Sequence, residues 1–226
     1  MKRRVLVLAP HPDDESITGL LALRLRQECG FEVWVAPVTL GSCPTRRAAR
    51  MRELRAACRV LGFRCRMPMR RGEDSASLRQ LRTVLEKIRP VVVVLPHARD
   101  GHPTHRAVHR LGLAALDAVR FAAMPVVETE YWHPLARPNL MVAARGEHLK
   151  MLRRALACHK GEILRNDYAA RLPAWMSDNV RRGAERIGGK GAAAPKIAYA
   201  TLYRIRMRVR GKWKAAFRGG RIIVTP

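Results

Sequence analysis

The sequence has 226 residues, of which 48% are hydrophobic, enough for one large folded domain and too apolar for a chain that is disordered throughout. Its 44 Lys and Arg against 18 Asp and Glu give a net charge of +26. This excess favours a polyanionic partner without choosing among nucleic acid, an anionic membrane surface and an acidic or phosphorylated substrate.

The sequence also lacks the patterns of a membrane-spanning protein and of a disulfide or thiolate-zinc framework. No apolar run reaches the roughly 20 residues of a membrane-spanning helix, and the short apolar start runs straight into charged residues, which predicts a cytoplasmic protein. The five cysteines form no Cys-x-x-Cys pair, so the sequence indicates neither a thiolate zinc site nor a disulfide framework. They are Cys29, Cys43, Cys58, Cys65 and Cys158.

The first half of the chain alternates apolar runs with amphipathic runs. The predicted strands are Val5–Ala9, Phe31–Val38, Phe63–Met67 and Val91–Leu95, and the predicted helices are Ser16–Cys29, Arg46–Leu61, Leu78–Ile88 and Thr104–Arg120. Strands that are apolar on both faces and alternate with helices indicate a parallel sheet covered on each side. We therefore expect an α/β fold, a Rossmann-like three-layer sandwich with a mostly parallel central sheet.

The second half is less regular. Val126–Tyr131 and Leu140–Ala143 are candidate strands, Glu147–His159 is a candidate helix, and an Ala-Ala-Ala-Pro break precedes Lys196–Val209. We expect one domain over residues 1–203 and a basic C-terminal β extension over residues 204–226 that packs on it.

The C-terminal extension has a pattern of its own. In Arg204–Arg210 arginine alternates with apolar residues, which predicts a strand with one basic face. Gly219 and Gly220 could turn a hairpin into Arg221–Thr225. The basic face has two interpretations: an edge strand that charge protects from aggregation, or an anion-binding surface for phosphate, nucleotide-sugar, lipid headgroup or nucleic acid. Aromatic residues are only 5%, which argues against a dedicated single-strand nucleic-acid binder.

Ionisable residues follow two of the predicted strands directly. The segment PHPDDE, residues 10–15, follows the first strand, and GHPTH, residues 101–105, follows Val91–Leu95 after a short loop. Ligands of such sheets bind beyond the carboxyl ends of the strands, where a divalent cation would compensate the clustered charge. Two His and one carboxylate around an open position are the usual hydrolytic zinc set, although iron or manganese would also accept these ligands.

Each of these residues also has a structural explanation. Asp13 or Asp14 could cap the helix that follows. His102 and His105 could be ordinary loop and helix histidines, and His105 with His109, spaced i and i+4, could form a different metal pair. Their joint occurrence at two strand ends favours the metal site.

The strand followed by PHPDDE, with HPTH after a later strand, resembles the LmbE/PIG-L family of zinc-dependent N-deacetylases, whose members carry (A/P)HPDDE and HPDH motifs. The resemblance covers about Val5–Tyr203. It extends to Val38–Gly41, Arg50 with Glu53, Glu147–His159 and Ile197–Tyr203. Two departures are Thr104, where the family has Asp, and Ser42, where Glu is common.

The resemblance implies a reaction and a role for each residue. The reaction would remove an N-acyl group, most often N-acetyl, from an amino sugar or sugar conjugate with zinc-activated water, and Fe²⁺ is the alternative metal. The zinc ligands would be His11, Asp14 and His105. Asp13 would be the general base, His102 as an imidazolium would stabilise the oxyanion, and Arg50 would contact the substrate.

The partner implied is a small N-acylated sugar or conjugate, which could be anionic. The sequence leaves open whether the chain forms a homo-oligomer. A competing interpretation is a deacetylase scaffold that has lost turnover and binds nucleic acid or another polyanion. The presence of both Asp13 and His102 argues against it. A nucleotide-binding module is excluded because the chain has no Gly-x-Gly-x-x-Gly or P-loop sequence.

Overall fold

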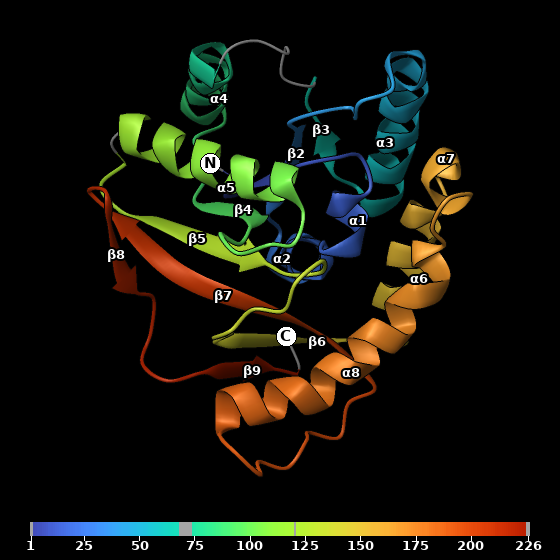
Figure 1. The fold of residues 1–226 in the computed structure, drawn as a ribbon. Helices are drawn as coiled ribbons and strands as arrows, with labels where there is room; N and C mark the ends of the chain where they lie inside the picture. Colours follow the sequence, from blue (N-terminus) through green and yellow to red (C-terminus); the bar gives the residue numbers. More distant parts are fainter. Residues whose placement is uncertain (1, 68–73, 120, 225–226) are drawn as a thin grey trace.

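One mixed sheet runs through the molecule, as the computed structural model shows for residues 2–67, 74–119 and 121–224 (Figure 1). In spatial order the strands are β3-β2-β1-β4-β5-β7-β6-β9, and β8 pairs with β7. Their bounds are β1 Arg4–Ala9, β2 Glu32–Pro37, β3 Arg64–Cys65, β4 Val92–Pro96, β5 Met124–Thr129, β6 Leu140–Ala144, β7 Tyr199–Val209, β8 Lys212–Ala215 and β9 Arg221–Ile223. The run from β3 to β5 is parallel, whereas β7 is antiparallel to both β5 and β6.

Helices cover both faces of this sheet. They are α1 Asp14–Ile17, α2 Leu20–Cys29, α3 Arg47–Leu61 after a 3₁₀ turn at Pro44–Arg46, α4 Asp74–Ile88, α5 Pro103–Val119, α6 Gly146–Leu156, α7 Lys160–Ile163 and α8 Tyr168–Gly188. Along β1, Val5 and Val7 enter the core shared with α2, α3 and α6, whereas Leu6 and Leu8 enter the core shared with α4 and α5. This alternation confirms the predicted three-layer α/β sandwich.

The predicted helix Ser16–Cys29 is divided into α1 and α2 by a buried tyrosine. The Tyr203 hydroxyl accepts the Leu21 N–H at 3.0 Å and donates to the Thr18 carbonyl at 2.9 Å. Gly19 lies at this break, and a Cβ there would stand 2.0 Å from the Glu15 carbonyl oxygen. The tyrosine thus satisfies backbone groups that an uninterrupted helix would have paired internally.

No element is predicted from the sequence over helix α8, which contains Pro173. Proline leaves the carbonyl of the preceding turn without its helical donor. Here the Ala169 carbonyl accepts a hydrogen bond from Arg153 Nε of α6 at 3.0 Å, so a side chain replaces the missing N–H. The Asp167 side chain also caps the helix by accepting the Ala170 N–H.

Two predictions for the C-terminal segment are wrong. The strand Arg204–Arg210 is not an edge strand, because β7 has β5 on one side and β6 and β8 on the other. The hairpin at Gly219 and Gly220 does not form, since β9 pairs in parallel with β6. The tight turn instead lies at Arg210 and Gly211, whose positive φ values of 46° and 74° suit a two-residue hairpin between β7 and β8.

The boundary expected between residues 203 and 204 falls inside β7. Arg120 and Thr225, which end two predicted elements, lie outside the described residues. Among the residues that the structure describes, no helix combines the length and apolarity needed to cross a bilayer.

Candidate metal centre

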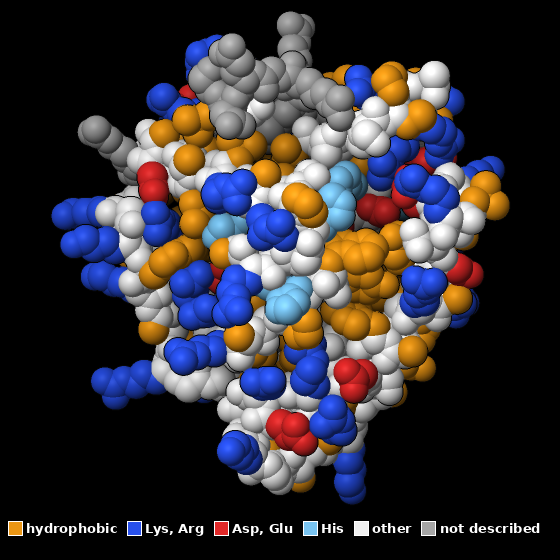
Figure 2. Space-filling view, viewed as in Figure 1, with side chains coloured by type: hydrophobic (Ala, Val, Ile, Leu, Met, Phe, Trp, Pro, Cys, Tyr) orange, Lys and Arg blue, Asp and Glu red, His pale blue; other side chains and the backbone are white. Residues whose placement is uncertain are grey.

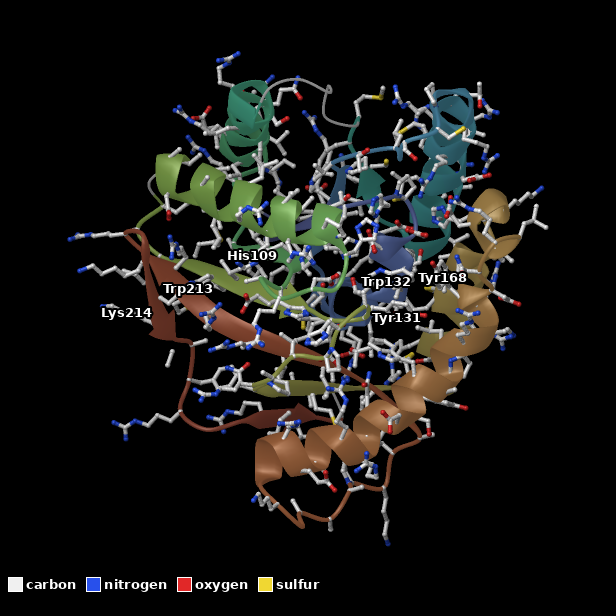
Figure 3. All side chains as sticks on the ribbon, in the orientation of Figure 1. His109, Tyr131, Trp132, Tyr168, Trp213 and Lys214 are labelled. Carbon is white, nitrogen blue, oxygen red and sulfur yellow. The ribbon has the colours of Figure 1, made fainter. Side chains whose placement is uncertain are left out.

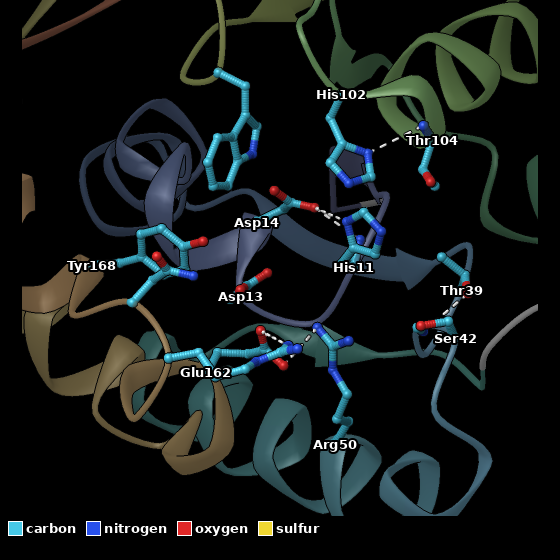
Figure 4. A pocket seen from close by; sticks show the side chains of 14 residues that line it. His11, Asp13, Asp14, Thr39, Ser42, Arg50, His102, Thr104, Glu162 and Tyr168 are labelled. Carbon is cyan, nitrogen blue, oxygen red and sulfur yellow. Dashed lines mark hydrogen bonds and ion pairs between the residues drawn. The ribbon is translucent and has the colours of Figure 1, made fainter.

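The two ionisable segments meet because the strands before them are neighbours. Strand β1 pairs in parallel with β4, so the loop after each strand leaves the same edge of the sheet. His11, Asp13 and Asp14 come from the first loop and the start of α1, and His102 and His105 come from the second loop and α5. Figure 4 shows His11, Asp14 and His102 around one hollow, with Asp13 facing into it.

His11, Asp14 and His105 form a set that fits a metal ion. One ligand atom from each lies within 4.8 Å of the others. The Asp14 Oδ2 atom lies 3.5 Å from both His11 Nδ1 and His105 Nε2, and ligands about 2.1 Å from a tetrahedral ion are separated by roughly 3.4 Å. The His105 Nε2 atom is buried without a hydrogen-bond partner in the described structure. A cation is the group that would satisfy it.

Asp100 orients the second histidine motif. Its Oδ2 atom lies 3.2 Å from His105 Nδ1, and its Oδ1 atom accepts the backbone N–H of His102 at 2.8 Å. Only 2% of Asp100 is exposed. A proton held on Nδ1 by this carboxylate leaves the Nε2 lone pair directed at Asp14, as a metal ligand requires. The sequence predicted no role for Asp100, although an Asp two residues before the motif was a usable signal.

The charge around His105 decides how readily it takes a proton. Burial by itself would lower its pKa, but the carboxylates of Asp14 and Asp100 outweigh burial and raise the pKa of His105 above its usual value. A proton therefore competes with a cation for this side chain in acid.

Asp13 has a strained backbone and a buried carboxyl group. Its φ of 123° is unusual for a residue other than glycine, and such strain is common at functional sites. Its backbone N–H donates to Glu15 Oε2 at 2.9 Å. Burial, followed by the charges of Asp14 and Glu15, raises the pKa of Asp13 well above its ordinary value, and Arg50 partly opposes this. The carboxyl group is therefore suited to holding a proton.

Glu15 connects the first motif to His159, the residue directly before α7. It is fully buried, and its Oε1 atom accepts hydrogen bonds from Ser16 Oγ at 2.6 Å and pairs with His159 Nε2 at 2.8 Å. The same carboxylate accepts the Asp13 N–H, so His159 helps to hold Asp13 in place through Glu15. This contact joins residues 144 positions apart and left no local sequence signal.

His102 lies beside the metal set with its ring in a defined tautomer. Its Nδ1 atom accepts the Thr104 N–H at 3.2 Å, and its ring centroid is 4.9 Å from that of His11. Burial, and then the neighbouring rings of His11 and His105, lower the pKa of His102. The Thr104 contact and the lowered pKa favour a neutral ring with its proton on Nε2 over the imidazolium expected.

Arg50 supports the first loop and lines the pocket. Its Nη2 atom donates to the Pro12 carbonyl at 3.1 Å and lies 3.5 Å from Glu162 Oε1, and its buried Nε has no hydrogen-bond partner in the described structure. Gly41 has a φ of 90°, and a Cβ there would meet Arg50 Nη1 at 2.3 Å. Glycine is therefore required where the backbone passes the guanidinium.

The pocket in front of these residues has a volume of about 450 Å³. Its aromatic wall is formed by Trp132 and Tyr168, whose ring centroids lie 5.6 Å apart at an angle of 89°. Figure 3 shows both side chains beside the site, and the same region of Figure 2 shows histidine and acidic side chains next to a hydrophobic wall. The pocket can therefore hold a polar ring against the aromatic side chains, with a carbonyl substituent of that ring facing His11, Asp14 and His105.

His109 stands apart from this centre. Its Nδ1 atom faces the Pro96 carbonyl at 3.0 Å and lies 3.8 Å from Glu128. It is absent from the metal-ligand set found among the described residues, so the alternative His105 and His109 pair gains no support.

Comparison with known proteins agrees with the geometry. The family described as PIG-L, GlcNAc-PI de-N-acetylase, matches residues 6–116. A probable N-acetyl-alpha-D-glucosaminyl L-malate deacetylase 2 of Bacillus cereus is 29% identical over 168 residues, which cover 65% of this chain and 74% of that protein.

Solved structures share the fold at low identity. The N,N'-diacetylchitobiose deacetylase of Pyrococcus horikoshii superimposes with a TM-score of 0.69 at 17% identity, over 90% of this chain and 83% of that one. The 4-carboxy-2-hydroxymuconate hydratase GalB of Pseudomonas putida gives 0.70 at 20% identity, over 90% and 95%. A deacetylase and a hydratase thus share this fold, and the residues of the site must distinguish between such reactions.

Proposed function

Because this chain belongs to the PIG-L/LmbE family of deacetylases, we propose that it is a metal-dependent amide hydrolase that removes an N-acetyl group from an amino sugar or its conjugate. The observation that carries the proposal is the convergence of His11, Asp14 and His105, with an unpartnered buried His105 Nε2, beside a pocket that is lined by His11, Asp13 and Asp14. We propose zinc as the metal, with Fe²⁺ as the alternative that this ligand set also accepts.

When bound, the cation supplies a Lewis acid that makes water nucleophilic near neutral pH and polarises the amide carbonyl. Asp13 takes the proton of the attacking water and delivers it to the departing amine nitrogen, which is a poor leaving group unless protonated. The raised pKa of Asp13 fits a group that holds this proton between the two steps. The bond broken is the amide C–N bond, and the products are acetate and the free amine.

The other residues of the pocket position the substrate and Asp13 and stabilise the charge that develops during attack. The Nε2–H of neutral His102 donates to the oxygen that gains negative charge during attack. Arg50 holds the Pro12 carbonyl and so keeps Asp13 in place, while its pocket side contacts substrate. Trp132 and Tyr168 pack against the apolar face of the sugar ring.

A test separates this enzyme from a scaffold that only binds. The protein loaded with zinc is incubated with N-acetylglucosamine and its 1-phosphate and malate conjugates, and acetate is quantified. We expect acetate release that a chelator abolishes. Asp13→Asn should retain the metal and lose at least about 1,000-fold of the turnover, because a charged base becomes a neutral amide. No acetate from any conjugate, or an Asp13→Asn variant with normal turnover, would contradict the proposal.

A further inference from the structure

No helix covers part of β7 on one face of the sheet. Figure 1 shows α5 in front of β4 and β5 and α8 in front of β6, and between these helices only the loop from β5 to β6 crosses in front of the long strand β7. Leu202 of β7 packs in the core beneath α8, and Val126, in the core beneath α5, pairs directly with Arg206. Alternation along the strand therefore places Arg204, Arg206 and Arg208 on this face, between the two helices. Figure 2 shows Lys and Arg side chains gathered over the same strip.

Two of these three arginines are already neutralised. Arg206 lies 2.7 Å from Glu128 Oε2, and its guanidinium stacks 3.8 Å above the ring of Trp213. Arg208 donates hydrogen bonds of 2.9 and 2.6 Å to the two carboxylate oxygens of Asp117. Both side chains thus tie β7 to neighbouring elements, which leaves them little capacity for a ligand.

Arg204 differs because no described side chain binds its guanidinium group directly. The side chain is half-buried, and within the described residues it makes no hydrogen bond or ion pair. Glu128 is opposite Arg204 in the backbone register of β5 and β7, but one of its carboxylate oxygens binds Arg206 and the other faces His109. Burial, and then the charges of Arg206 and Arg137, lower the pKa of Arg204, although Glu128 opposes them. A cation partly withdrawn from water among other cations needs an anion from outside the chain.

The segment that carries Arg137 is held against β7, near Arg204, by an asparagine. The Asn139 side chain accepts the Ile205 N–H at 2.7 Å and donates to the Ile205 carbonyl at 2.9 Å, while its backbone N–H donates to the Tyr203 carbonyl. These three bonds hold the end of the segment 130–139 against β7 on both sides of Arg204. Arg137 is exposed and, in the described part of the chain, has no ion pair.

We propose that Arg137 and Arg204 form a binding site for a phosphate group. Two guanidinium groups without internal partners offer planar sets of N–H donors, which phosphate matches with three acceptor oxygens and up to two negative charges. The segment that carries Arg137 also carries Trp132, which lines the pocket of the metal centre. A substrate with its sugar against Trp132 would extend along this segment, so the phosphate belongs to the substrate. This last step rests on the proposed deacetylase function.

Binding to the zinc-loaded Asp13→Asn protein, which prevents turnover, tests the site by calorimetry. The probes are N-acetylglucosamine 1-phosphate, N-acetylglucosamine and inorganic phosphate. We expect the phosphorylated sugar to bind at least about tenfold more tightly than the plain sugar. Arg204→Gln and Arg137→Gln should each abolish that advantage and leave the affinity for plain N-acetylglucosamine unchanged. Arg218→Gln, which removes an exposed arginine of the loop between β8 and β9, is the matched control and should change neither affinity.

The outcomes separate the site from the proposed function. The anion site is overturned if Arg218→Gln loses as much of the tighter binding of the phosphorylated sugar as Arg204→Gln does. It is also overturned if the phosphorylated sugar binds no more tightly than the plain sugar and inorganic phosphate does not bind. Binding of inorganic phosphate that Arg204→Gln removes, without an advantage for the phosphorylated sugar, overturns only the assignment to the substrate. Failure to bind either sugar contradicts the deacetylase function, and the inorganic phosphate arm still decides the site.

Thermal unfolding gives a second readout. Phosphate at about 100 times its dissociation constant should raise the melting temperature of the zinc-loaded protein by about 5 °C above a chloride control of equal ionic strength. Arg204→Gln should lose this rise, and without phosphate it should melt no lower than the parent, because the substitution breaks no hydrogen bond or ion pair among the described residues. A full rise in Arg204→Gln would refute the site.

Discussion

Replacing Asp100 by Asn tests how the second histidine motif is oriented. The change keeps the shape and an oxygen that can accept the His102 N–H, but it removes the negative charge 3.2 Å from His105 Nδ1. Both partners are at most 4% exposed, so solvent screens this interaction little. A hydrogen bond to a charged group contributes about 1.5–3 kcal/mol. Loss of a carboxylate behind a metal-ligating His weakens metal binding about 10- to 100-fold, or roughly 1.4–2.8 kcal/mol. The two magnitudes agree.

We therefore expect Asp100→Asn to bind zinc about 10- to 100-fold more weakly than the parent, measured by competition with a chromophoric chelator. Asp117→Asn is the matched control: it removes a carboxylate that also pairs with a cationic side chain, Arg208, but at the other end of α5 from His105. Its zinc affinity should equal that of the parent. An Asp100→Asn affinity within twofold of the parent would refute the role of Asp100 as a positioning residue.

Three further predictions concern pH, stability and the aromatic wall. Because the pKa of His105 is raised, lowering the pH below that value should weaken zinc binding about tenfold per unit for one displaced proton; affinity that stays constant from pH 8 to pH 5 would disagree. Tyr203→Phe should lower the free energy of unfolding in urea by about 1–3 kcal/mol, since the buried Leu21 N–H loses its acceptor. An unchanged free energy would show that the hydroxyl does not stabilise the break between α1 and α2. Trp132→Ala should reduce kcat/KM for an N-acetylated sugar about tenfold and leave zinc affinity unchanged; unaltered kinetics would exclude stacking.

The parts that could be predicted from sequence depend on local patterns. Strands such as Val91–Leu95 are continuous apolar runs, and the rule that ligands bind beyond strand ends placed residues 10–15 and 101–105 at the same edge of the sheet. The sequence could not show that β1 and β4 are adjacent, so the meeting of the two segments depended on that condition. In the structure the two strands pair, and His11, Asp14 and His105 lie close together.

The parts that could not be predicted depend on contacts between distant residues. Arg153 of α6 satisfies the carbonyl that Pro173 leaves unpaired in α8, and the Tyr203 hydroxyl divides the first predicted helix. Both contacts join segments that are far apart in the sequence and share no local pattern. The same is true of the His159 and Glu15 pair behind Asp13. At Arg204–Arg210 the alternation gave the strand and its basic face correctly, but it could not tell an edge strand from one that is paired on both sides.

The most direct measurement is a zinc titration of the metal-free protein and of its His105→Ala variant. If the two loops build one cation site, the protein binds one equivalent tightly, and His105→Ala binds at least about 100-fold more weakly, because one of three protein ligands is lost. Zinc affinity that is unchanged by His105→Ala, or the absence of tight binding by the parent, would show that these residues do not share an ion.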